Sequence, residues 1–306
     1  MKPERVAVIA HAGKSLGGGL DELRRLVRAG SVAKPLWYEV SKSRKAPKKV
    51  REALAKDADL IFVWGGDGMV QRCIDAAVGS EATIAIVPAG TANLLAHNLG
   101  IPQDLGEAVR IGFGSNHRRL DVGRIKGEHF AVMAGIGFDA DMIAAADGGL
   151  KDRMGRLAYI WTGLRAVDAP PVQVRIKVDG EKWFRGEASC VLFGNVAKVF
   201  GNVEVFDGVE PDDGRLAVGV STARGPAEWA RALARIGTGP SAASPFVEMT
   251  RARRVTVKLA TALRYELDGG ARTRVSKAKV LLVPSAIAVC VPGLLKTSDA
   301  LGDDDD

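Results

Sequence analysis

The residues best placed to do chemistry form a glycine-rich turn, Gly65-Gly66-Asp67-Gly68, that follows the apolar run Leu60–Val63. Such a run is typical of a buried strand, and the residues after the turn favour a helix. Glycines let backbone N–H groups approach anionic oxygens, and the N-terminus of a helix attracts such groups. Asp67 would then bind a ribose or orient a phosphate through water or magnesium. The turn therefore predicts a nucleotide site.

A second turn of this kind, Pro88-Ala89-Gly90-Thr91-Ala92-Asn93, follows the apolar run Ile84–Val87. It places the Thr91 hydroxyl and the Asn93 amide at the start of a predicted helix. Thr91 is suited to cap that helix, and capping is compatible with a phosphate contact. The nearness of the two turns in sequence strengthens the nucleotide hypothesis.

The N-terminal part of the chain alternates predicted strands and helices. This repetition indicates a parallel sheet with helices on both faces. Ligands of such sheets bind beyond the carboxyl ends of the strands, where both glycine turns fall. The predicted strands are residues 6–10, 37–40, 60–63 and 84–87, and the predicted helices are residues 20–29, 47–56, 70–78 and 91–98.

From about residue 118 the pattern changes to short β-branched or alternating runs. Asp179-Gly180 and Asp268-Gly269 are typical of hairpin turns. These features predict a mostly antiparallel β domain, interrupted by helical insertions. The predicted strands are residues 119–125, 130–134, 172–178, 189–193, 216–220, 255–259 and 287–291, and the insertions are residues 139–146 with 156–167, and residues 226–236.

The predicted fold class is thus an α/β N-terminal domain followed by a β-sandwich-like domain, with a ligand cleft between them. We expect the first domain at residues 1–117, completed by the returning segment 286–298. The second domain is expected at residues 118–285, and the acidic end, residues 299–306, is expected to be disordered.

Composition narrows the class of protein. The net charge of +7 over 306 residues is compatible with an anionic partner or with plain solubility. Basic clusters without interleaved aromatic residues argue against single-stranded nucleic acid. No stretch reaches the roughly 20 apolar residues that span a bilayer. Three scattered cysteines indicate buried thiols in a reducing cytoplasm, and neither a disulfide framework nor a zinc site.

Transfer of a phosphoryl group to a hydroxyl needs a base near the acceptor oxygen, and a carboxylate is sufficient. The candidates in the second half are Asp121, Asp139, Asp213 and Asp268. Their spacing alone does not choose among them.

Five segments, taken in order, resemble the diacylglycerol kinase catalytic family, which includes sphingosine and ceramide kinases and soluble bacterial lipid kinases. Each segment is weak alone, but the ordered set covers nearly the whole chain. The segments are residues 65–68, 88–93 with Ala96, 120–123, 135–140, and 211–216 followed by 267–269.

The resemblance implies a two-domain kinase with ATP between the domains. Asp268 would be the general base on a lipid hydroxyl. Asp213, with the carbonyls of Glu210 and Arg215, would match a structural magnesium loop. Contacts to the nucleotide would come from Gly65, Gly66, Asp67, Gly68, Met69, Gln71, Thr91 and the Asn93 amide. Ser41 is a weaker match for such a contact.

The implied partners are ATP with Mg²⁺ and a lipid alcohol, with diacylglycerol as the default acceptor. A cytoplasmic protein that contacts an anionic membrane surface is expected, through the apolar insertion at residues 157–164 and the basic residues beside it. Nucleic acid is not an expected partner, and a homodimer is left open.

The chain departs from the family pattern beside the expected phosphates. Met69, Gln71 and Arg72 stand where the family has threonine, asparagine and glutamate, and Gly270 replaces the glutamate of an Asp-Gly-Glu turn. Arg72 would supply positive charge or mark altered nucleotide handling. The first strand ends at Ala10-His11 and lacks the family's Asn-Pro.

Two alternatives remain at this stage. An NAD kinase also carries the glycine turn, but it pairs the turn with an Asn-Glu dipeptide that this chain lacks. A nucleotide- or lipid-binding protein without catalysis would explain the departures. Retention of Asp67 and Asp268 counts against that reading.

Overall fold

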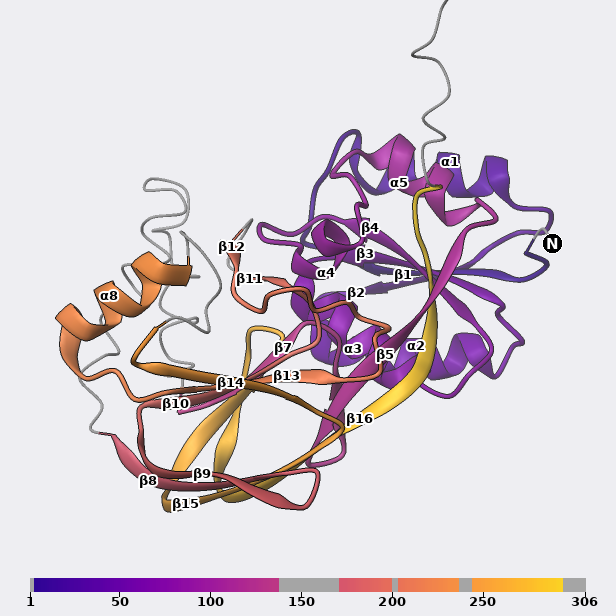
Figure 1. Ribbon diagram of the computed structural model, residues 1–306. Coiled ribbons are helices and arrows are strands. Elements are labelled where there is room, and N and C mark those ends of the chain that lie inside the picture. The colour runs from indigo at the N-terminus through magenta and orange to yellow at the C-terminus, as the bar shows by residue number, and fades with distance from the viewer. Residues whose placement is uncertain (1–2, 138–170, 200–202, 237–243, 294–306) are drawn as a thin grey trace, which may run out of the picture.

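The computed structural model describes residues 3–137, 171–199, 203–236 and 244–293. The insertion expected at residues 139–146 with 156–167, the candidate Asp139 and the acidic end lie outside the described residues. The chain forms an α/β part, drawn from indigo to magenta, and a β-rich part, drawn mainly in orange and yellow (Figure 1). This arrangement confirms the predicted fold class.

The α/β part is built on a parallel sheet. Strands β1 (Val6–His11), β2 (Leu36–Val40), β3 (Leu60–Gly65) and β4 (Thr83–Pro88) are arranged in the order β4-β3-β1-β2. All three neighbouring pairs are parallel. The strands β1 and β3 are almost continuously apolar and buried, as expected for a sheet that is covered on both faces.

Helices cover both faces of this sheet. Helices α1 (Gly19–Gly30) and α5 (Leu105–Gly112) lie together on one face, and α2 (Ala46–Leu54) and α3 (Asp67–Ala77) lie on the other (Figure 1). Helix α5, which the sequence analysis did not anticipate, is capped by Asp104, whose side chain accepts from the Glu107 N–H at 2.8 Å.

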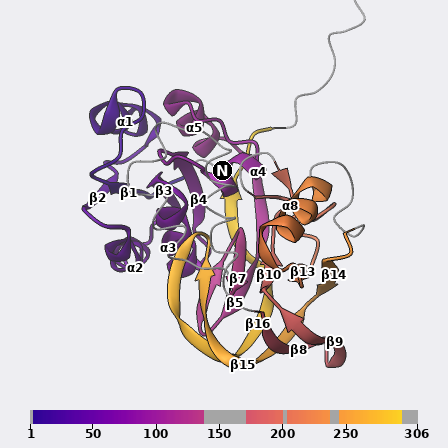
Figure 2. The same cartoon turned by 90° about the vertical axis from the view of Figure 1, so that its left-hand side faces the viewer.

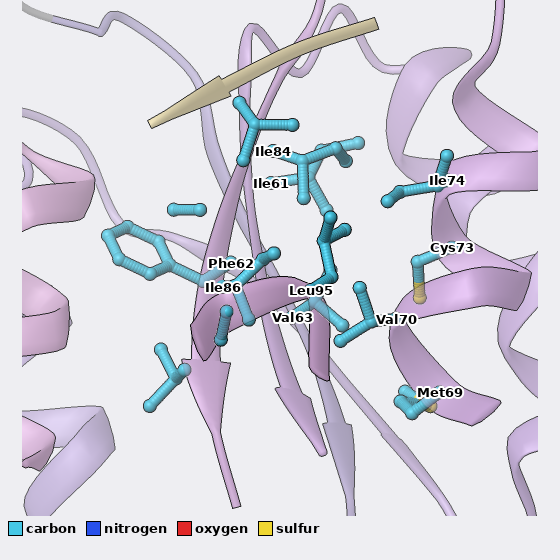
Figure 3. Close-up of a cluster of buried hydrophobic side chains, with 14 of the residues drawn as sticks. Ile61, Phe62, Val63, Met69, Val70, Cys73, Ile74, Ile84, Ile86 and Leu95 are labelled. Carbon is cyan, nitrogen blue, oxygen red and sulfur yellow. The ribbon is translucent and has the colours of Figure 1, made fainter. Parts of the chain in front are cut away.

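The apolar face of α3 packs on β3 and β4. Figure 3 shows side chains of α3 directed toward those of the two strands and of the short helix α4 (Leu94–Asn98). Met69 lies among them and is 1% exposed. The start of α3, and with it the glycine turn, is therefore fixed by burial of the helix against the sheet.

The β-rich part is an antiparallel arrangement, in the order β14-β13-β10-β7-β15-β16. A hairpin of β8 and β9 flanks β15 (Figures 1 and 2). Its strands are β5 (His117–Ile125), β6 (Glu128–Phe130), β7 (Met133–Ile136), β8 (Val172–Val178), β9 (Glu181–Ala188), β10 (Cys190–Gly194), β13 (Leu216–Ser221), β14 (Val247–Ala252) and β15 (Arg254–Leu267), with the short pair β11 (Lys198–Val199) and β12 (Val203–Glu204), and α8 spans Gly225–Ile236.

One long strand, β16 (Gly270–Cys290), joins the two parts. It pairs antiparallel with β15 and β5, and its end pairs in parallel with β4 through Ala288 and Val289. The strand predicted at residues 287–291 is thus the end of this element. Through β16 the antiparallel strands and the parallel strands therefore form one continuous sheet.

Some predicted elements differ from the structure. The strand expected at residues 255–259 is part of the longer strand β15. The strand expected at residues 130–134 is two strands, β6 and β7, because the N–H groups between them turn to the Asp268 carboxylate. The helix expected from Thr91 begins at Leu94, after a left-handed residue at Asn93 with φ of 47°.

The three cysteines are buried free thiols, as predicted. Among the helices that the structure describes, none combines the length and apolar character required to cross a membrane.

Candidate active site

The two glycine turns lie against each other at the carboxyl ends of β3 and β4. A Cβ atom on Gly90 would lie 2.4 Å from Gly66 Cα, and one on Gly66 would lie 3.0 Å from Gly90 Cα. A side chain at either position would force the backbones apart. The close approach therefore explains why both turns carry glycine, and it brings the two predicted turns into contact.

Asp67 and Asn93 hold this pair of turns in shape. Asp67 Oδ1 accepts from the Leu94 N–H at 2.5 Å and so caps α4 from the neighbouring turn. The Asn93 side chain exchanges two hydrogen bonds with the backbone of Gly90, each of 2.9 Å. Thr91 is exposed and makes no cap, because α4 begins three residues later. The predicted cap at Thr91 was wrong, and Asp67 takes that role.

Asp268 is held on the side of the β-rich part. Its Oδ1 accepts from the N–H groups of Val132 and Met133 at 2.9 and 2.8 Å, and its Oδ2 accepts from that of Ala131 at 2.9 Å. The side chain is buried, with 5% exposure. A carboxylate with three backbone donors is fixed in orientation, as a base requires.

The electrostatics of Asp268 connect it to the glycine turn. Burial raises the pKa of Asp268 to about 6, the three backbone N–H groups act in the opposite direction, and the negative charge of Asp67 adds to the rise. The predicted base and the predicted nucleotide turn are therefore near enough to interact. A carboxyl that titrates near neutrality suits a general base.

Asn195 supports the segment that holds Asp268. Its Nδ2 donates to the carbonyls of Asp121 and Ala131 at 2.9 and 3.0 Å, and its backbone N–H donates to the Val132 carbonyl at 2.8 Å. Asn195 is 1% exposed. The sequence analysis missed this residue, since a single asparagine in an apolar strand region carries no local signal of a partner more than sixty residues away.

Asp121, one of the four candidate bases, has a structural role. Its Oδ1 accepts from the Ser285 N–H at 2.7 Å and its Oδ2 from the Gly214 N–H at 2.9 Å. These bonds join β5 to an irregular step in β16 and to the loop after residue 210. The structure therefore assigns Asp121 to linking three segments.

Glu266 is a second buried acid beside Asp268. Burial raises its pKa to about 8, the Gly269 N–H lowers it, the negative charge of Asp268 raises it, and Arg272 lowers it. Sequence analysis missed Glu266, although an acid inside the apolar end of a strand, two residues before an Asp-Gly turn, was a readable signal. Arg272 itself bonds to Glu128, with Nε and Nη2 each 2.8 Å from Oε2.

The three residues of α3 that differ from the family pattern lie in different environments. Met69 is core, and Gln71, 3% exposed, donates from Nε2 to the His129 carbonyl at 2.7 Å. Arg72 is half-buried, and its pKa is lowered by burial and by the nearby Arg272. Gln71 thus ties α3 to β6, and nucleotide contacts by Met69 and Gln71 remain predictions.

Asp75 and His129 add a second tie between α3 and β6. Asp75 Oδ1 accepts from both the backbone N–H and Nδ1 of His129, each at 2.8 Å. Burial alone would raise the pKa of Asp75, but these two hydrogen bonds, together with the charges of His129 and Arg272, lower it. The helix that starts at the glycine turn is therefore anchored to the β-rich part.

Ser41 lies at the carboxyl end of β2, on the same edge of the sheet as the turns. It is exposed, and its hydroxyl accepts from Lys45 Nζ at 3.4 Å. At the end of β1, His11 Nδ1 accepts from the Gly13 N–H at 3.2 Å. The geometry leaves the role predicted for Ser41 open.

The loop expected to hold magnesium is organised by an arginine. Asp213 accepts from the backbone N–H groups of Arg215 and Glu210, and its Oδ2 accepts from Arg251 Nη1 at 3.1 Å. Arg251 Nη2 also donates to the carbonyls of Asp207 and Gly208, at 2.8 and 2.6 Å. The carboxylate thus already faces a cation. These residues do not fit a magnesium ion in the arrangement expected from Asp213, Glu210 and Arg215.

Comparisons with known proteins agree with this geometry. The family model of the diacylglycerol kinase catalytic domain matches residues 6–125, and that of the YegS C-terminal NAD kinase beta sandwich-like domain matches residues 131–291. The diacylglycerol kinase of Bacillus subtilis (strain 168) is 29% identical over 232 residues, which cover 73% of this chain and 75% of that protein. A Pseudomonas aeruginosa protein named "Probable lipid kinase YegS-like" is 30% identical over 302 residues, covering 95% of this chain and 96% of that protein.

Solved structures show the same fold. The crystal structure of a diacylglycerol kinase from Bacillus anthracis str. Sterne superposes with a TM-score of 0.74 at 21% identity, over 95% of this chain and 98% of that one. An NAD kinase from Archaeoglobus fulgidus, in complex with ATP, gives 0.54 at 10% identity, over 93% of both chains. The match of both domains and the full-length relative show that this chain belongs to the lipid kinase family of the diacylglycerol kinases and YegS-like proteins.

Proposed function

We propose that this protein transfers the γ-phosphoryl group of ATP to the hydroxyl of a lipid alcohol, with diacylglycerol as the default acceptor. The observation that carries the proposal is Asp268, a buried carboxyl held by three backbone N–H groups and influenced by the charge of Asp67 in the glycine turn. A base and a phosphate-binding turn are the two parts that such a transfer needs.

The hydrogen bonds of Asp268 support Oδ2 as the oxygen that would act. A carboxylate has about four lone-pair positions. Oδ1 accepts two backbone bonds, and Oδ2 accepts one. Oδ2 therefore has room for one more hydrogen bond, from the acceptor hydroxyl.

In the proposed reaction, the proton of the acceptor hydroxyl moves to Asp268 Oδ2 while the hydroxyl oxygen forms a bond to the γ-phosphorus. The bond between that phosphorus and the bridging oxygen breaks, and ADP leaves with the electron pair. Magnesium that arrives with ATP would neutralise charge on the phosphates. The backbone of the two turns would position the phosphates, and positioning and electrostatics supply most of the rate.

We further propose that residues 1–117, with the returning segment 286–298, bind the nucleotide, and that residues 118–285 bind the acceptor. The parallel pairing of Ala288 and Val289 with β4 supports this division. We also propose that the protein is cytoplasmic and contacts an anionic membrane surface, which a lipid acceptor and a net charge of +7 support.

The test offers the purified protein labelled ATP and magnesium with diacylglycerol, sphingosine, other lipid alcohols or NAD. The proposal expects label in a lipid and a loss of kcat of roughly 10²–10⁴-fold in Asp268→Asn, the usual contribution of a general base. The matched control is Asp21→Asn, which changes an aspartate whose side chain is 97% exposed. Label in NAD would favour the NAD kinase alternative, and ATP binding without transfer to any acceptor would favour a binding protein.

A further inference from the structure

Glu266 lies at a rigid point of the β-rich part. It is the residue before the last of β15, and its backbone is paired with Gly135 of β7 on one side and Ala271 of β16 on the other. The side chain is 1% exposed. Oε2 accepts from the Gly269 N–H at 2.9 Å, while Oε1 is buried and has no hydrogen-bond partner among the described residues. Buried polar atoms are nearly always paired, so this oxygen needs a partner such as water or substrate.

The bond from Glu266 spans the turn that carries Asp268. Asp268 and Gly269 have φ values of 44° and 80°, and Leu267 pairs with Gly270, which makes this a two-residue hairpin turn. Left-handed backbone is unfavourable for most residues that carry a side chain. The carboxyl of Glu266 therefore stabilises the conformation that presents Asp268 to the site.

The charges around Glu266 do not compensate an ionised carboxylate. On the same hairpin, the negative charge of Asp268 acts on Glu266. Asp268 is itself influenced by the negative charge of Asp67 from α3. Strand β16 offers Arg272, whose guanidinium is bonded to Glu128 of β6 and to the carbonyls of Gly270 and Ala271.

Other neighbouring elements do not change this balance. Strand β7, on the other side of Glu266, carries no titratable residue. The preceding residue of β15, Tyr265, is buried and neutral, and burial raises its pKa. Arg72 and Asp75 of α3 interact electrostatically with Arg272. Because the charges of Arg72 and Asp75 are opposite, their effects oppose each other. A buried acid without a bonded cation is more stable when it carries its proton.

We propose that Glu266 is a positioning residue for phosphoryl transfer, which stays protonated at neutral pH, braces the Asp268-Gly269 turn and leaves Asp268 as the one ionised carboxyl of the pair. This role rests on the proposed function in that it takes Asp268 as the base. The two acids then share one proton between about pH 6 and pH 8, the values to which burial raises their pKa. Ionisation of Glu266 above this range would add a second buried negative charge where the transferred phosphoryl group is itself negative.

The first experiment measures kcat against pH for the wild type, Glu266→Gln and Glu266→Ala with the lipid acceptor. The wild type should show an acid limb near pH 6 and a fall of roughly tenfold per pH unit above about pH 8. Glu266→Gln keeps an oxygen for the Gly269 N–H but cannot ionise, so it should keep the acid limb and lose the alkaline one. Glu266→Ala lacks the brace, and its kcat at pH 7 should be at least tenfold below that of Glu266→Gln. An unchanged alkaline limb in Glu266→Gln, or equal kcat in the two variants, would overturn the proposal.

The second experiment needs no substrate and separates this proposal from the proposed function. Urea midpoints of the wild type and Glu266→Gln are measured from pH 5 to pH 9, with Glu181→Gln, an exposed glutamate of β9, as the control. As the pH rises, the urea concentration at the unfolding midpoint should fall more for the wild type than for Glu266→Gln. The midpoint of Glu181→Gln should change with pH as that of the wild type does. A constant difference between wild type and Glu266→Gln would refute a protonated Glu266 even if lipid is phosphorylated. The expected divergence would support it even if no acceptor is found.

Discussion

The two sides of the candidate site are assembled over very different distances along the chain. On the proposed nucleotide side, the turns at Gly66 and Gly90 directly follow neighbouring strands, and Asp67 and Asn93 bond within this short stretch. On the proposed acceptor side, Asp268 is held by N–H groups from residues 131–133, which precede it by 135 to 137 positions, and Asn195 supports that segment from a third place. A glycine-rich turn can thus be built locally, whereas the environment of a buried carboxyl is a product of the tertiary fold.

The largest expected effect concerns the acceptor side and pH. Glu266 and Asp268 have folded-state pKa values of about 8 and 6, above their ordinary 4.5 and 3.8. The folded protein therefore holds protons that the unfolded chain releases, and this contribution to stability is lost as the pH rises from about 4 to 8. At roughly 1.4 kcal/mol per pKa unit, the loss is on the order of several kcal/mol. In chemical denaturation, the free energy of unfolding of the double variant Glu266→Gln/Asp268→Asn should fall less with rising pH than that of the wild type. The same pH dependence in both proteins would contradict the burial of these charges.

The contact between the two glycine turns is tested by adding one methyl group at Gly90. Gly90→Ala would place Cβ at 2.4 Å from Gly66 Cα, so we expect a loss of about 1–3 kcal/mol in the free energy of unfolding. Gly68→Ala is the matched control, because a Cβ there meets nothing within 4 Å and Gly68 lies in α3. It should stabilise the fold by up to about 1 kcal/mol. Equal effects of the two substitutions would refute the close contact of the turns.

The support of the acceptor side is tested by Asn195→Ala. This change removes two donor bonds and leaves the carbonyls of Asp121 and Ala131 without that partner. We expect a destabilisation of about 1–3 kcal/mol, together with a lower kcat, because the segment that orients Asp268 is loosened. Asn116→Ala is a matched asparagine substitution at an exposed position. Wild-type kcat in folded Asn195→Ala would show that Asp268 does not depend on this support.

The contrast between the two sides also explains what the sequence could predict. Strands β1 to β4 and the fold class follow from apolar runs and from glycines near them in sequence. Strands β9 and β14 were not predicted. Asp268 was found only through a family resemblance, since its spacing did not separate it from Asp121 and Asp213. Asn195 and the bonding role of Glu266 depend on contacts between distant segments, which no local pattern records. The split of the strand expected at residues 130–134 has the same origin, because Asp268 captures its N–H groups.

A smaller effect is expected at the loop around Asp213. Because Arg251 already supplies a cation there, removal of divalent metal with EDTA should leave the melting temperature of the wild type unchanged. Arg251→Met should lower it, since two carbonyls and a carboxylate lose their donor, whereas Arg274→Met on the exposed surface of β16 should not. A melting temperature that falls in EDTA would show that this loop binds a metal after all.

The most direct test of one shared site is the titration of the Asp268 carboxyl by carbon NMR in the wild type and in Asp67→Asn. Both proteins are measured without substrate, and Asp21→Asn is the control. If the glycine turn and the base face each other, the wild-type midpoint lies near pH 6 and falls in Asp67→Asn, because removal of a neighbouring negative charge favours the ionised form. A midpoint near the ordinary value of 3.8 in the wild type, or one that does not move in Asp67→Asn, would contradict the account.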